Sequence, residues 1–314
     1  MDRKPVSVKS YANIAIVKYW GKADAERMIP STSSISLTLE NMYTETKLSF
    51  LPEDATGDVM YIDDELQGEK ETTKASKVLD LFRTNPNQHV KIETWNNMPT
   101  AAGLSSSSSG LSALVKAANE LFQVGKTQSE LAQIAKFASG SSSRSFFGPL
   151  AAWDKDSGEV YPVETELKLA MIMLVLTDQK KPVSSRDGMK LCTETSTSFP
   201  EWIKQSEQDY KDMLGYLKAN DFQAVGELTE ANALRMHQTT STANPPFSYL
   251  TDASYQAMDK VKALRASGEQ CYFTMDAGPN VKVLCLEEDL DRLADHFRKD
   301  YQIIVSRTKE LPDA

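Results

Sequence analysis

PTAAGLSSSSSG, residues 99–110, runs directly into LSALVKAANELF, residues 111–122. The second segment carries apolar residues at helical spacing and predicts a well-formed amphipathic helix. Small residues in the first segment let the backbone approach an anion closely, and the N–H groups at a helix start stabilise phosphate. Serine hydroxyls add donors to phosphate and candidate ligands to Mg²⁺. The stretch therefore predicts a phosphate-binding loop that leads into a helix.

Two common phosphate-binding motifs are absent from the sequence. Neither G-x-x-x-x-G-K-[ST] nor a strand–G-x-G-x-x-G–helix unit occurs, so the P-loop and Rossmann interpretations lose their motifs. The alternative for the serine run is a flexible linker, but a linker would not be followed at once by a strong amphipathic helix.

Strands and loops precede the serine run, and helices follow it. Residues 6–17 and 35–50 are rich in β-branched and alternating residues, and residues 90–95 make another strand. A second helix is expected at residues 129–138, with Thr127 as its N-cap. The small-residue run SGSSSRSFFG, residues 139–148, is expected to close that helix as a loop.

The second half of the chain begins with a buried strand at residues 169–176 and continues with helices. It then gives a strand, the turn DAGPN, a second strand, a helix and a last strand. This order of β, helices, β, β, α and β matches a split β-α-β, or ferredoxin-like, pattern. The helices are expected at residues 184–198, 202–219, 222–238 and 249–267, and the later elements at residues 270–275, 281–286, 288–300 and 302–306.

The composition is that of an ordinary globular protein, with 40% hydrophobic and 25% charged residues. The formal net charge of −9 argues against nucleic acid as the main partner, although it allows a local cationic pocket. No apolar run approaches the roughly 20 residues needed to span a bilayer, and the N-terminal segment lacks the features of a signal peptide. We therefore expect a cytoplasmic protein with no nucleic-acid or membrane partner, and its length suggests two domains or one large one.

The cysteines and histidines predict no metal site. Cys192, Cys271 and Cys285 form no C-x-x-C pair and no even framework, so reduced buried thiols are expected. The histidines are scattered along the chain, and none is assigned to catalysis or to a metal.

Five segments carry a resemblance to a known family. P-x-x-x-G-L-x-S-S in the serine loop resembles the phosphate loop of the GHMP kinases, and together with four further segments it resembles the diphosphomevalonate decarboxylases of that superfamily. One departure is Ser105, which stands where relatives usually have Ala or Gly, and it leaves open whether Ser106 or Ser107 contacts phosphate. The further segments are AxIAxVKYWGK at residues 12–22, SGSSSRS at 139–145, KKPVSSRDGM at 180–189 and MDAGPN at 275–280.

The resemblance implies an α+β GHMP-kinase fold in two lobes. A ribosomal-S5-like α/β lobe, residues 1–183, would carry most nucleotide contacts. A ferredoxin-like α+β lobe, residues 184–314, would supply Asp276 to a cleft between the lobes. The resemblance also implies a homodimer.

The activity implied by the resemblance is ATP-dependent decarboxylation of (R)-5-diphosphomevalonate to isopentenyl diphosphate in the mevalonate pathway. ADP, phosphate and CO₂ are released, and Mg²⁺ accompanies ATP. ATP is needed because hydroxide is a poor leaving group and phosphate a good one. No carbanion sink is required, so pyridoxal phosphate and thiamine diphosphate have no evident role.

Such a substrate needs several cations in one pocket. By resemblance, Tyr19, Lys22 and Arg186, with Lys74, would hold the diphosphate, and the planar fork of Arg144 suits the carboxylate. Lys74 has the alternative of a solvated surface position, since it lies in the polar run GEKETTKASK. Ser184 and Ser185 have the alternative of capping a helix. Trp20 and Trp95 could stack on adenine, but such residues more often pack in the core. The remaining expected substrate contacts are Trp20, Gly21, Ser139, Gly140, Ser141, Ser142, Ser143 and Ser185.

Asp276 is the expected catalytic carboxylate, at the end of the apolar strand QCYFTM. By resemblance it accepts or orients the proton of the C3 hydroxyl, and its structural alternative is an ordinary turn. Arg144 is expected to join it in catalysis, while Lys181 and Lys18 stabilise phosphoryl charge. The expected ATP contacts are Gly103, Leu104, Ser105, Ser106, Ser107 and Ser108, with Ser106 or Ser107 on Mg²⁺.

Other acceptors and another class of function stay open from the sequence. An enzyme of the same fold could decarboxylate mevalonate 5-phosphate, or phosphorylate the C3 hydroxyl of mevalonate and stop there. A catalytically inactive relative could bind ATP and metabolite as a sensor, although Asp276, Arg144 and the serine loop are all present.

Overall fold

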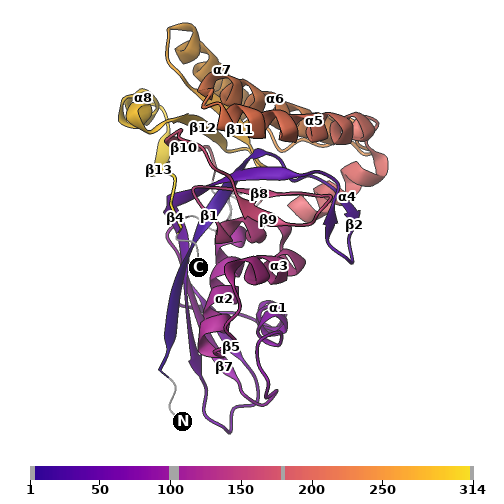
Figure 1. Ribbon diagram of the computed structural model, residues 1–314, viewed down its shortest axis with the longest axis vertical. Coiled ribbons are helices and arrows are strands. Elements are labelled where there is room, and N and C mark those ends of the chain that lie inside the picture. The colour runs from indigo at the N-terminus through magenta and orange to yellow at the C-terminus, as the bar shows by residue number, and fades with distance from the viewer. Residues whose placement is uncertain (1–3, 99–105, 178–180, 312–314) are drawn as a thin grey trace.

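Two β-sheets, one in each of two lobes, organise the chain (Figure 1). This computed structural model describes residues 4–98, 106–177 and 181–311. The first sheet has seven strands in the order β6-β5-β7-β4-β8-β9, with β1 paired to β4. Its strands are β1 (Val6–Val17), β4 (Ser34–Phe50), β5 (Val59–Ile62), β6 (Glu65–Leu66), β7 (Val90–Asn96), β8 (Leu150–Trp153) and β9 (Val160–Pro162).

Strand β4 is the central strand of this sheet because it pairs with three other strands. It runs antiparallel to β1, to β7 over residues 44–50 and to β8 over residues 34–37. The predicted strands at residues 6–17, 35–50 and 90–95 are confirmed. The short strands, including the hairpin of β2 (Lys22–Asp24) and β3 (Ile29–Pro30), were not predicted, because two to four residues carry too little alternation.

Three α-helices cover the first sheet: α1 (Glu69–Leu79), α2 (Ser106–Leu121) and α3 (Gln128–Ala138). Helix α2 begins inside the serine run, before the predicted start at residue 111. Helix α3 has the predicted N-cap, since the Thr127 side chain accepts from the Glu130 N–H in a capping box. Helix α1 was not predicted, because only Ala75, Val78 and Leu79 of this polar segment are buried.

The run at residues 139–148 was expected to be a loop, but most of it is a 3₁₀ helix, η1 (Gly140–Phe146). Serine hydroxyls support the tight turns: Ser142 Oγ donates to Ser139 O at 2.6 Å, and Ser143 Oγ donates to Gly140 O at 2.9 Å. They add to backbone i to i+3 bonds of the 3₁₀ type, as where Ser142 N–H donates to Ser139 O at 3.0 Å. The expectation failed because small polar residues are typical of loops as well.

The second sheet has four strands in the order β11-β12-β10-β13, and its pairs are antiparallel. This order confirms the predicted split β-α-β pattern. Helices α5, α6 and α7 lie together at the end of the molecule away from β5 and β7 (Figure 1). The elements are β10 (Leu169–Val175), α4 (Ser185–Thr195), α5 (Phe199–Lys218), α6 (Phe222–Ser241), α7 (Asp252–Ala266), β11 (Tyr272–Met275), β12 (Val281–Leu286), η2 (Glu287–Asp289), α8 (Leu290–Arg298) and β13 (Gln302–Arg307).

One hydrophobic cluster joins the two lobes. It includes Ile14 and Ile16 of β1, Leu37 of β4, Met171 of β10 and Met213 of α5, all fully buried. Strand β10 precedes residue 184 but pairs with β12 and β13. The second sheet therefore contains strands from both sides of the expected boundary between residues 183 and 184. The division into residues 1–183 and 184–314 stays a prediction.

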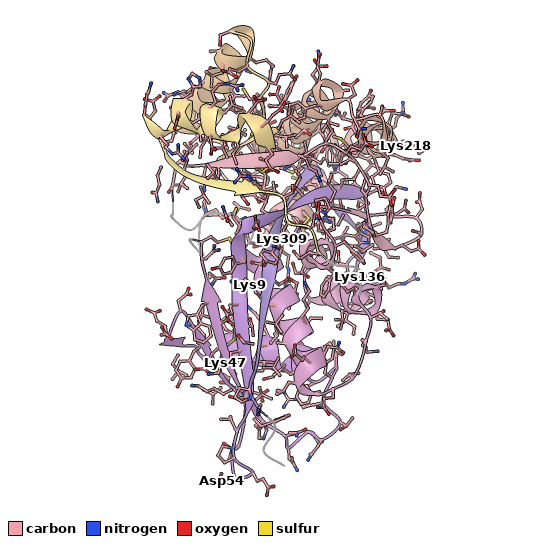
Figure 2. The ribbon with its side chains drawn as sticks, turned by 60° about the vertical axis from the view of Figure 1, so that its left-hand side comes forward. Lys9, Lys47, Asp54, Lys136, Lys218 and Lys309 are labelled. Atoms are coloured by element: carbon pink, nitrogen blue, oxygen red, sulfur yellow. The ribbon has the colours of Figure 1, made fainter. Side chains whose placement is uncertain are left out.

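Charged side chains extend from the surfaces of both lobes, with Asp54 at the tip of the first lobe and Lys218 on the helical end of the second (Figure 2). Among the described helices, none combines the length and the apolar character that crossing a bilayer would require.

Candidate active site

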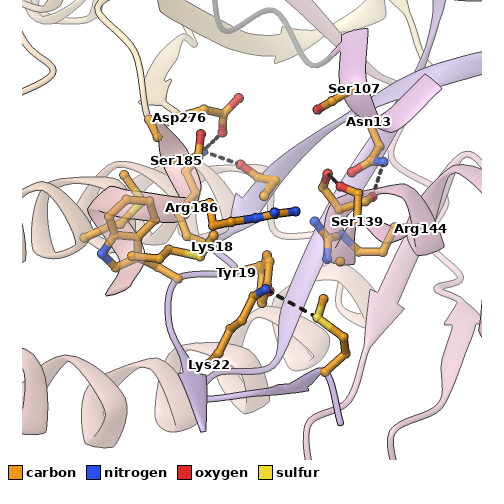
Figure 3. Close-up of a pocket in the computed structure, with 18 of the residues that line it drawn as sticks. Asn13, Lys18, Tyr19, Lys22, Ser107, Ser139, Arg144, Ser185, Arg186 and Asp276 are labelled. Carbon is orange, nitrogen blue, oxygen red and sulfur yellow. Dashed lines mark hydrogen bonds and ion pairs between the residues drawn. The ribbon is translucent and has the colours of Figure 1, made fainter. Parts of the chain in front are cut away.

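A pocket of about 440 Å³ lies between the end of β1, η1, the start of α4 and the turn after β11 (Figure 3). It therefore draws its lining from segments that are far apart in the sequence. The predicted site residues that line it are Lys18, Tyr19, Trp20, Lys22, Ser107, Ser139, Gly140, Ser141, Arg144, Lys181, Ser185, Arg186 and Asp276.

Asp276 follows β11 directly, and two buried lysines hold its carboxylate. Lys18 Nζ lies 2.8 Å from Oδ1, and Lys282 Nζ lies 3.0 Å from Oδ2. Burial by itself would raise the pKa of Asp276, but the two lysine charges and their hydrogen bonds outweigh it and hold the pKa well below its usual range. Asp276 is therefore an anchored carboxylate anion and not an ordinary turn residue.

Lys18 lies just beyond β1, with its side chain 2% exposed. Burial lowers the pKa of Lys18 to about 8, against the opposing effect of the Asp276 charge. Its Nζ also donates to Ala15 O at 2.7 Å, and its backbone N–H donates to Asn232 Oδ1 of α6 at 2.8 Å. The second lobe thus holds both the backbone and the charge of this residue.

Arg144 of η1 is buried at the opposite wall of the pocket (Figure 3). Its Nε donates to Ser36 Oγ at 2.6 Å and its Nη1 donates to Ser34 Oγ at 2.8 Å, both on β4. Burial lowers the pKa of Arg144 to about 10, so it stays charged at neutral pH. Because its bonded partners are neutral hydroxyls, its charge is available to an anion in the pocket.

Tyr19, Lys22 and Arg186 gather at one end of the pocket (Figure 3). Burial raises the pKa of Tyr19 to about 12, so its hydroxyl keeps its proton and can donate. Burial and the nearby Arg186 charge lower the pKa of Lys22. Gly140 lies against the Tyr19 ring, and a Cβ there would come within 2.9 Å of it, so only glycine fits. This end offers two cations and a hydroxyl.

Lys181 connects the start of α4 to the turn after β11, on the side of the pocket that the second lobe forms. Its Nζ donates to Ser185 Oγ at 2.7 Å and to Ala277 O at 2.6 Å. Burial lowers the pKa of Lys181, while the Asp276 charge opposes this effect. Ser184 caps α4 by accepting from the Asp187 N–H, so the capping alternative holds for Ser184, while Ser185 lines the pocket.

The serine run is described only in part. Ser107, in the first turn of α2, is exposed and lines the pocket. Ser108 is fully buried and does not line it. Gly103, Leu104, Ser105 and the side chain of Ser106 lie outside the described residues. Ser107 is thus the serine of this run whose described side chain faces the site.

Some predicted contacts are not brought to the pocket. Lys74 lies on α1, 60% exposed, and pairs with Glu71, as its surface alternative proposed. Ser142 and Ser143 are buried and donate to backbone carbonyls, Ser142 to Ala135 O of α3 and Ser143 to Gly140 O of η1. Gly21 turns the chain into β2 at a φ of +108°, a conformation that favours glycine, and does not line the pocket. These positions support the pocket wall or lie away from it.

Trp20 lines the pocket but belongs to the core. It is 2% exposed, and its indole N–H donates to Thr239 Oγ1 at 2.9 Å. Trp202 in turn donates to Trp20 O at 2.9 Å. Trp20 therefore fixes the segment between Lys18 and Lys22 against α5 and α6.

Sequence reasoning missed several site residues. Asn13 lines the pocket and donates to Ser141 O and Ser145 Oγ, which ties β1 to η1. An amide inside the apolar run YANIAIV is a signal that could have indicated it. Lys282 carries a similar signal inside VKVLCL, whereas the apolar lining residues Met28, Phe137, Met189 and Met236 carry none.

The pocket as a whole is cationic, in a protein of negative net charge. Of the described residues that line it, Asp276 is the acidic one, and it faces Lys18, Lys22, Lys181, Arg144 and Arg186. Such a site binds a multiply charged anion and places a hydrogen-bond acceptor beside it.

The described residues contain no group of three or more His, Cys, Asp or Glu side chains that could hold a metal ion. Mg²⁺ does not require such a group, because it is commonly bound through substrate phosphates with few protein ligands. The exposed Ser107 hydroxyl at the pocket fits that role.

Comparison with known families matches both parts of the chain. The model described as the diphosphomevalonate decarboxylase-like N-terminal domain matches residues 10–161, and that of the mevalonate 5-diphosphate decarboxylase C-terminal domain matches residues 171–312. The diphosphomevalonate decarboxylase of Candida albicans is 31% identical over 319 residues, covering 94% of this chain and 88% of the relative.

Solved structures show the same relationship. The mevalonate pyrophosphate decarboxylase from Streptococcus pyogenes superimposes with a TM-score of 0.97 at 67% identity, over 100% of this chain and 99% of that one. A structure described as MDDEF in complex with MVAPP, AMPPCP and magnesium superimposes with a TM-score of 0.90 at 40% identity, over 98% of both chains.

Proposed function

The chain belongs to the diphosphomevalonate decarboxylase family, and we propose that its pocket holds diphosphomevalonate with the C3 hydroxyl beside Asp276. It has the GHMP-kinase fold, in the α+β form expected from the sequence. It is an ATP-dependent enzyme that converts (R)-5-diphosphomevalonate to isopentenyl diphosphate in the mevalonate pathway. The observation that carries the site assignment is that Asp276, the acidic residue among the described residues that line the pocket, faces cations from both lobes.

The reaction needs a better leaving group at a tertiary carbon. The C3 hydroxyl oxygen bonds to the γ-phosphorus of ATP, the bond from that phosphorus to the β-phosphate oxygen breaks, and ADP leaves. The hydroxyl proton passes to an oxygen of the transferred phosphoryl group. The C3–O bond then breaks and phosphate departs with the electron pair. Electrons of the bond to the carboxylate carbon form the terminal alkene, and CO₂ is released.

Asp276 acts on the hydroxyl as a hydrogen-bond acceptor that orients it. Its two lysine partners depress its pKa, so it is a weak base and remains an anion throughout the usual pH range. Phosphoryl transfer has a loose transition state that depends mainly on alignment and charge stabilisation. An anchored acceptor suits that requirement better than a strong but mobile base.

Arg144 binds the substrate carboxylate. Its guanidinium is fixed by Ser34 and Ser36, so it needs no reorganisation when the substrate arrives. Ser139 and Ser141, which line the same wall, add hydroxyl groups. The carboxylate is thereby held next to C3 until phosphate departs.

The diphosphate occupies the end of the pocket with Tyr19, Lys22 and Arg186. The planar Arg186 fork and the Lys22 ammonium neutralise its charge, and the protonated Tyr19 hydroxyl donates to it. Lys74 has no part in this contact, because it lies on the exposed face of α1.

ATP approaches along the N-terminus of α2. The helix dipole and the Ser107 hydroxyl favour its phosphates there. Lys181 and Lys18 stabilise the charge of the transferred phosphoryl group. When Mg²⁺ is bound, it neutralises phosphate charge, and Ser107 would be its protein ligand.

The proposal also covers the oligomeric state and the cellular location of the protein. We propose a homodimer, following the family, which light scattering on the purified protein tests directly. We also propose a cytoplasmic location, since the three cysteines are free and buried, as thiols in a reducing compartment are.

A comparison of acceptors tests the proposed function. The protein is supplied with ATP, Mg²⁺ and either mevalonate, its 5-phosphate or its 5-diphosphate, and ADP and CO₂ are measured together. We expect equal release of ADP and CO₂ from the diphosphate and much weaker turnover as each phosphate is removed. Absence of both products with the diphosphate contradicts the proposal, and ADP without CO₂ indicates a kinase instead.

A further inference from the structure

Lys282 is a buried lysine at Asp276 that no recognised motif of this chain contains. It lies on β12, directly after Val281 and two residues beyond the end of the MDAGPN segment, and its side chain is 1% exposed. Its Nζ is 3.0 Å from Asp276 Oδ2. The residue is therefore close enough to act on the carboxylate while lying outside the segments that predicted the site.

The position of Lys282 in the sheet is that of a core residue. It pairs across the sheet with Thr274 of β11 and Met173 of β10, so these side chains point to the same face. Buried apolar side chains of the cluster between the lobes, Met173 and Leu284 among them, occupy this face. A lysine at such a position costs folding free energy unless its charge is compensated.

The compensation comes from Asp276, whose two oxygens are divided between two lysines. Lys18 binds Oδ1 and lines the pocket. Lys282 binds Oδ2 and is not among the described residues that line the pocket. Oδ1 is thus the oxygen held from the pocket side, and Oδ2 the oxygen held from within the second sheet.

We propose that Lys282 is a positioning residue for decarboxylation, which fixes Asp276 through Oδ2 so that Oδ1 meets the C3 hydroxyl. This inference rests on the proposed role of Asp276. An arriving hydroxyl must share Oδ1 with Lys18, and during that exchange the ion pair with Lys282 keeps the carboxylate from rotating. A fixed acceptor is what alignment in a loose phosphoryl transfer requires.

The surroundings of Asp276 leave this role to Lys282. Within the described ranges, the other charged or titratable groups that act at Asp276 come from η1, the segment before α4, α6 and the end of β1: Arg144, Lys181, His237 and Lys18. Arg144, Lys181 and Lys18 line the pocket and face the substrates. Burial lowers the pKa of His237 to about 4, so it is neutral at physiological pH and supplies no charge.

The test uses two substitutions at this position. Lys282→Met keeps the length of the side chain, suits the apolar face and removes the charge. Lys282→Arg keeps the charge. With diphosphomevalonate, ATP and Mg²⁺, we expect Lys282→Met to lower kcat by about 100-fold and to leave KM for diphosphomevalonate within about threefold. Lys282→Arg should recover at least about a tenth of the parent kcat.

A matched control is Lys116→Met in the first lobe. Burial lowers the pKa of Lys116 to about 8, but its Nζ donates to Ser10 Oγ and Ser145 O and not to a carboxylate. Its replacement should keep kcat within about threefold of the parent, which shows that loss of a buried lysine is not by itself the cause.

Several outcomes overturn the inference: a Lys282→Met kcat within about threefold of the parent, a rise in KM that accounts for the loss, an equal loss in Lys282→Arg, or an unfolded Lys282→Met protein in circular dichroism. The last outcome would make Lys282 a residue needed for folding. Absence of turnover in the parent protein is a separate result, because it contradicts the proposed function itself.

Discussion

At the scale of single residues, the site depends on how buried charges are compensated. A buried charge is expensive unless partners replace the lost water. Asp276 has two lysines, and Arg144 has two serine hydroxyls. The difference matters for function, because Asp276 is already neutralised whereas Arg144 retains an uncompensated charge that a substrate carboxylate can satisfy.

Arg144→Lys tests whether the site needs the planar geometry of the Arg144 guanidinium or only its positive charge. A lysine keeps the cation but cannot bind Ser34, Ser36 and a carboxylate in one plane. We expect kcat/KM for diphosphomevalonate to fall by about 100-fold, measured as ADP release under steady-state conditions. Arg298→Lys, on the exposed surface of α8, is the control and should leave kcat/KM unchanged. An Arg144→Lys enzyme with parental kcat/KM would remove the planar contact from the mechanism.

Sequence motifs predicted Asp276, Arg144 and the cations around them, because loops with Gly, Ser and Pro concentrate the chemistry in short segments. They did not predict Lys282 or Asn13, since Lys282 lies in a strand whose other residues are apolar and Asn13 lies in the apolar end of β1. The structure is needed to show that Lys282, opposite Thr274 in the sheet, reaches Asp276.

At the scale of elements, helices that carry no expected catalytic residue still shape the site. Helix α6 contributes Asn232, which holds the backbone of Lys18, and Thr239, which holds Trp20. It also contributes His237, whose ring packs edge-on against Tyr249 at a centroid distance of 6.3 Å. Such contacts could not be predicted, because periodicity places a helix but not the element that it packs against.

His237 predicts a pH dependence of stability. Burial, and then the Lys18 charge, lower its pKa from 6.5 to about 4 in the folded protein. The unfolded chain therefore binds more protons between these pH values, so the contribution to stability is complete above about pH 6.5 and is lost as the pH falls toward 4. The free energy of unfolding in urea should fall by about 3 kcal/mol from this group over that window.

Two substitutions isolate the effect. His237→Gln cannot titrate and should flatten the pH dependence of the free energy of unfolding. His296→Gln, at a 43% exposed position, should retain the parental slope. Equal slopes in the parent and in His237→Gln would show that the histidine is not buried in its neutral form.

At the scale of the whole molecule, the pocket exists because the lobes are locked together. Residues of β1 and the loop after it supply Lys18 to Lys22, but polar contacts from the second lobe fix them. The order of the elements in the second sheet could be predicted from the sequence pattern. The junction between the lobes could not, since its contacts join residues about 200 positions apart.

Asn232→Leu tests the junction. Asn232 is fully buried, accepts from the Lys18 N–H and donates to Asp209 Oδ2, each at 2.8 Å. Leucine leaves the Lys18 N–H unsatisfied and removes one of the two hydrogen bonds that Asp209 Oδ2 accepts, the other coming from Arg235. We therefore expect a loss of about 3 kcal/mol in the free energy of unfolding. Because Lys18 shifts, kcat should fall as well.

The control for the junction is Thr229→Val on the same helix. Thr229 is also fully buried, but its Oγ1 bonds within α6 to Val225 O. We expect a cost of about 1 kcal/mol and an unchanged kcat. Similar losses of kcat in both variants would mean that α6 stability, and not its contact with Lys18, controls the rate.

The central claim is that cations from both lobes bind the substrate while the carboxylate at position 276 serves the chemistry. Single-turnover ADP formation by Asp276→Asn, with diphosphomevalonate affinity measured by calorimetry, tests it most directly. We predict a rate at least about 1,000-fold below the parent and an affinity within about tenfold of it. A parental rate, or an affinity lost together with the rate, would contradict the account.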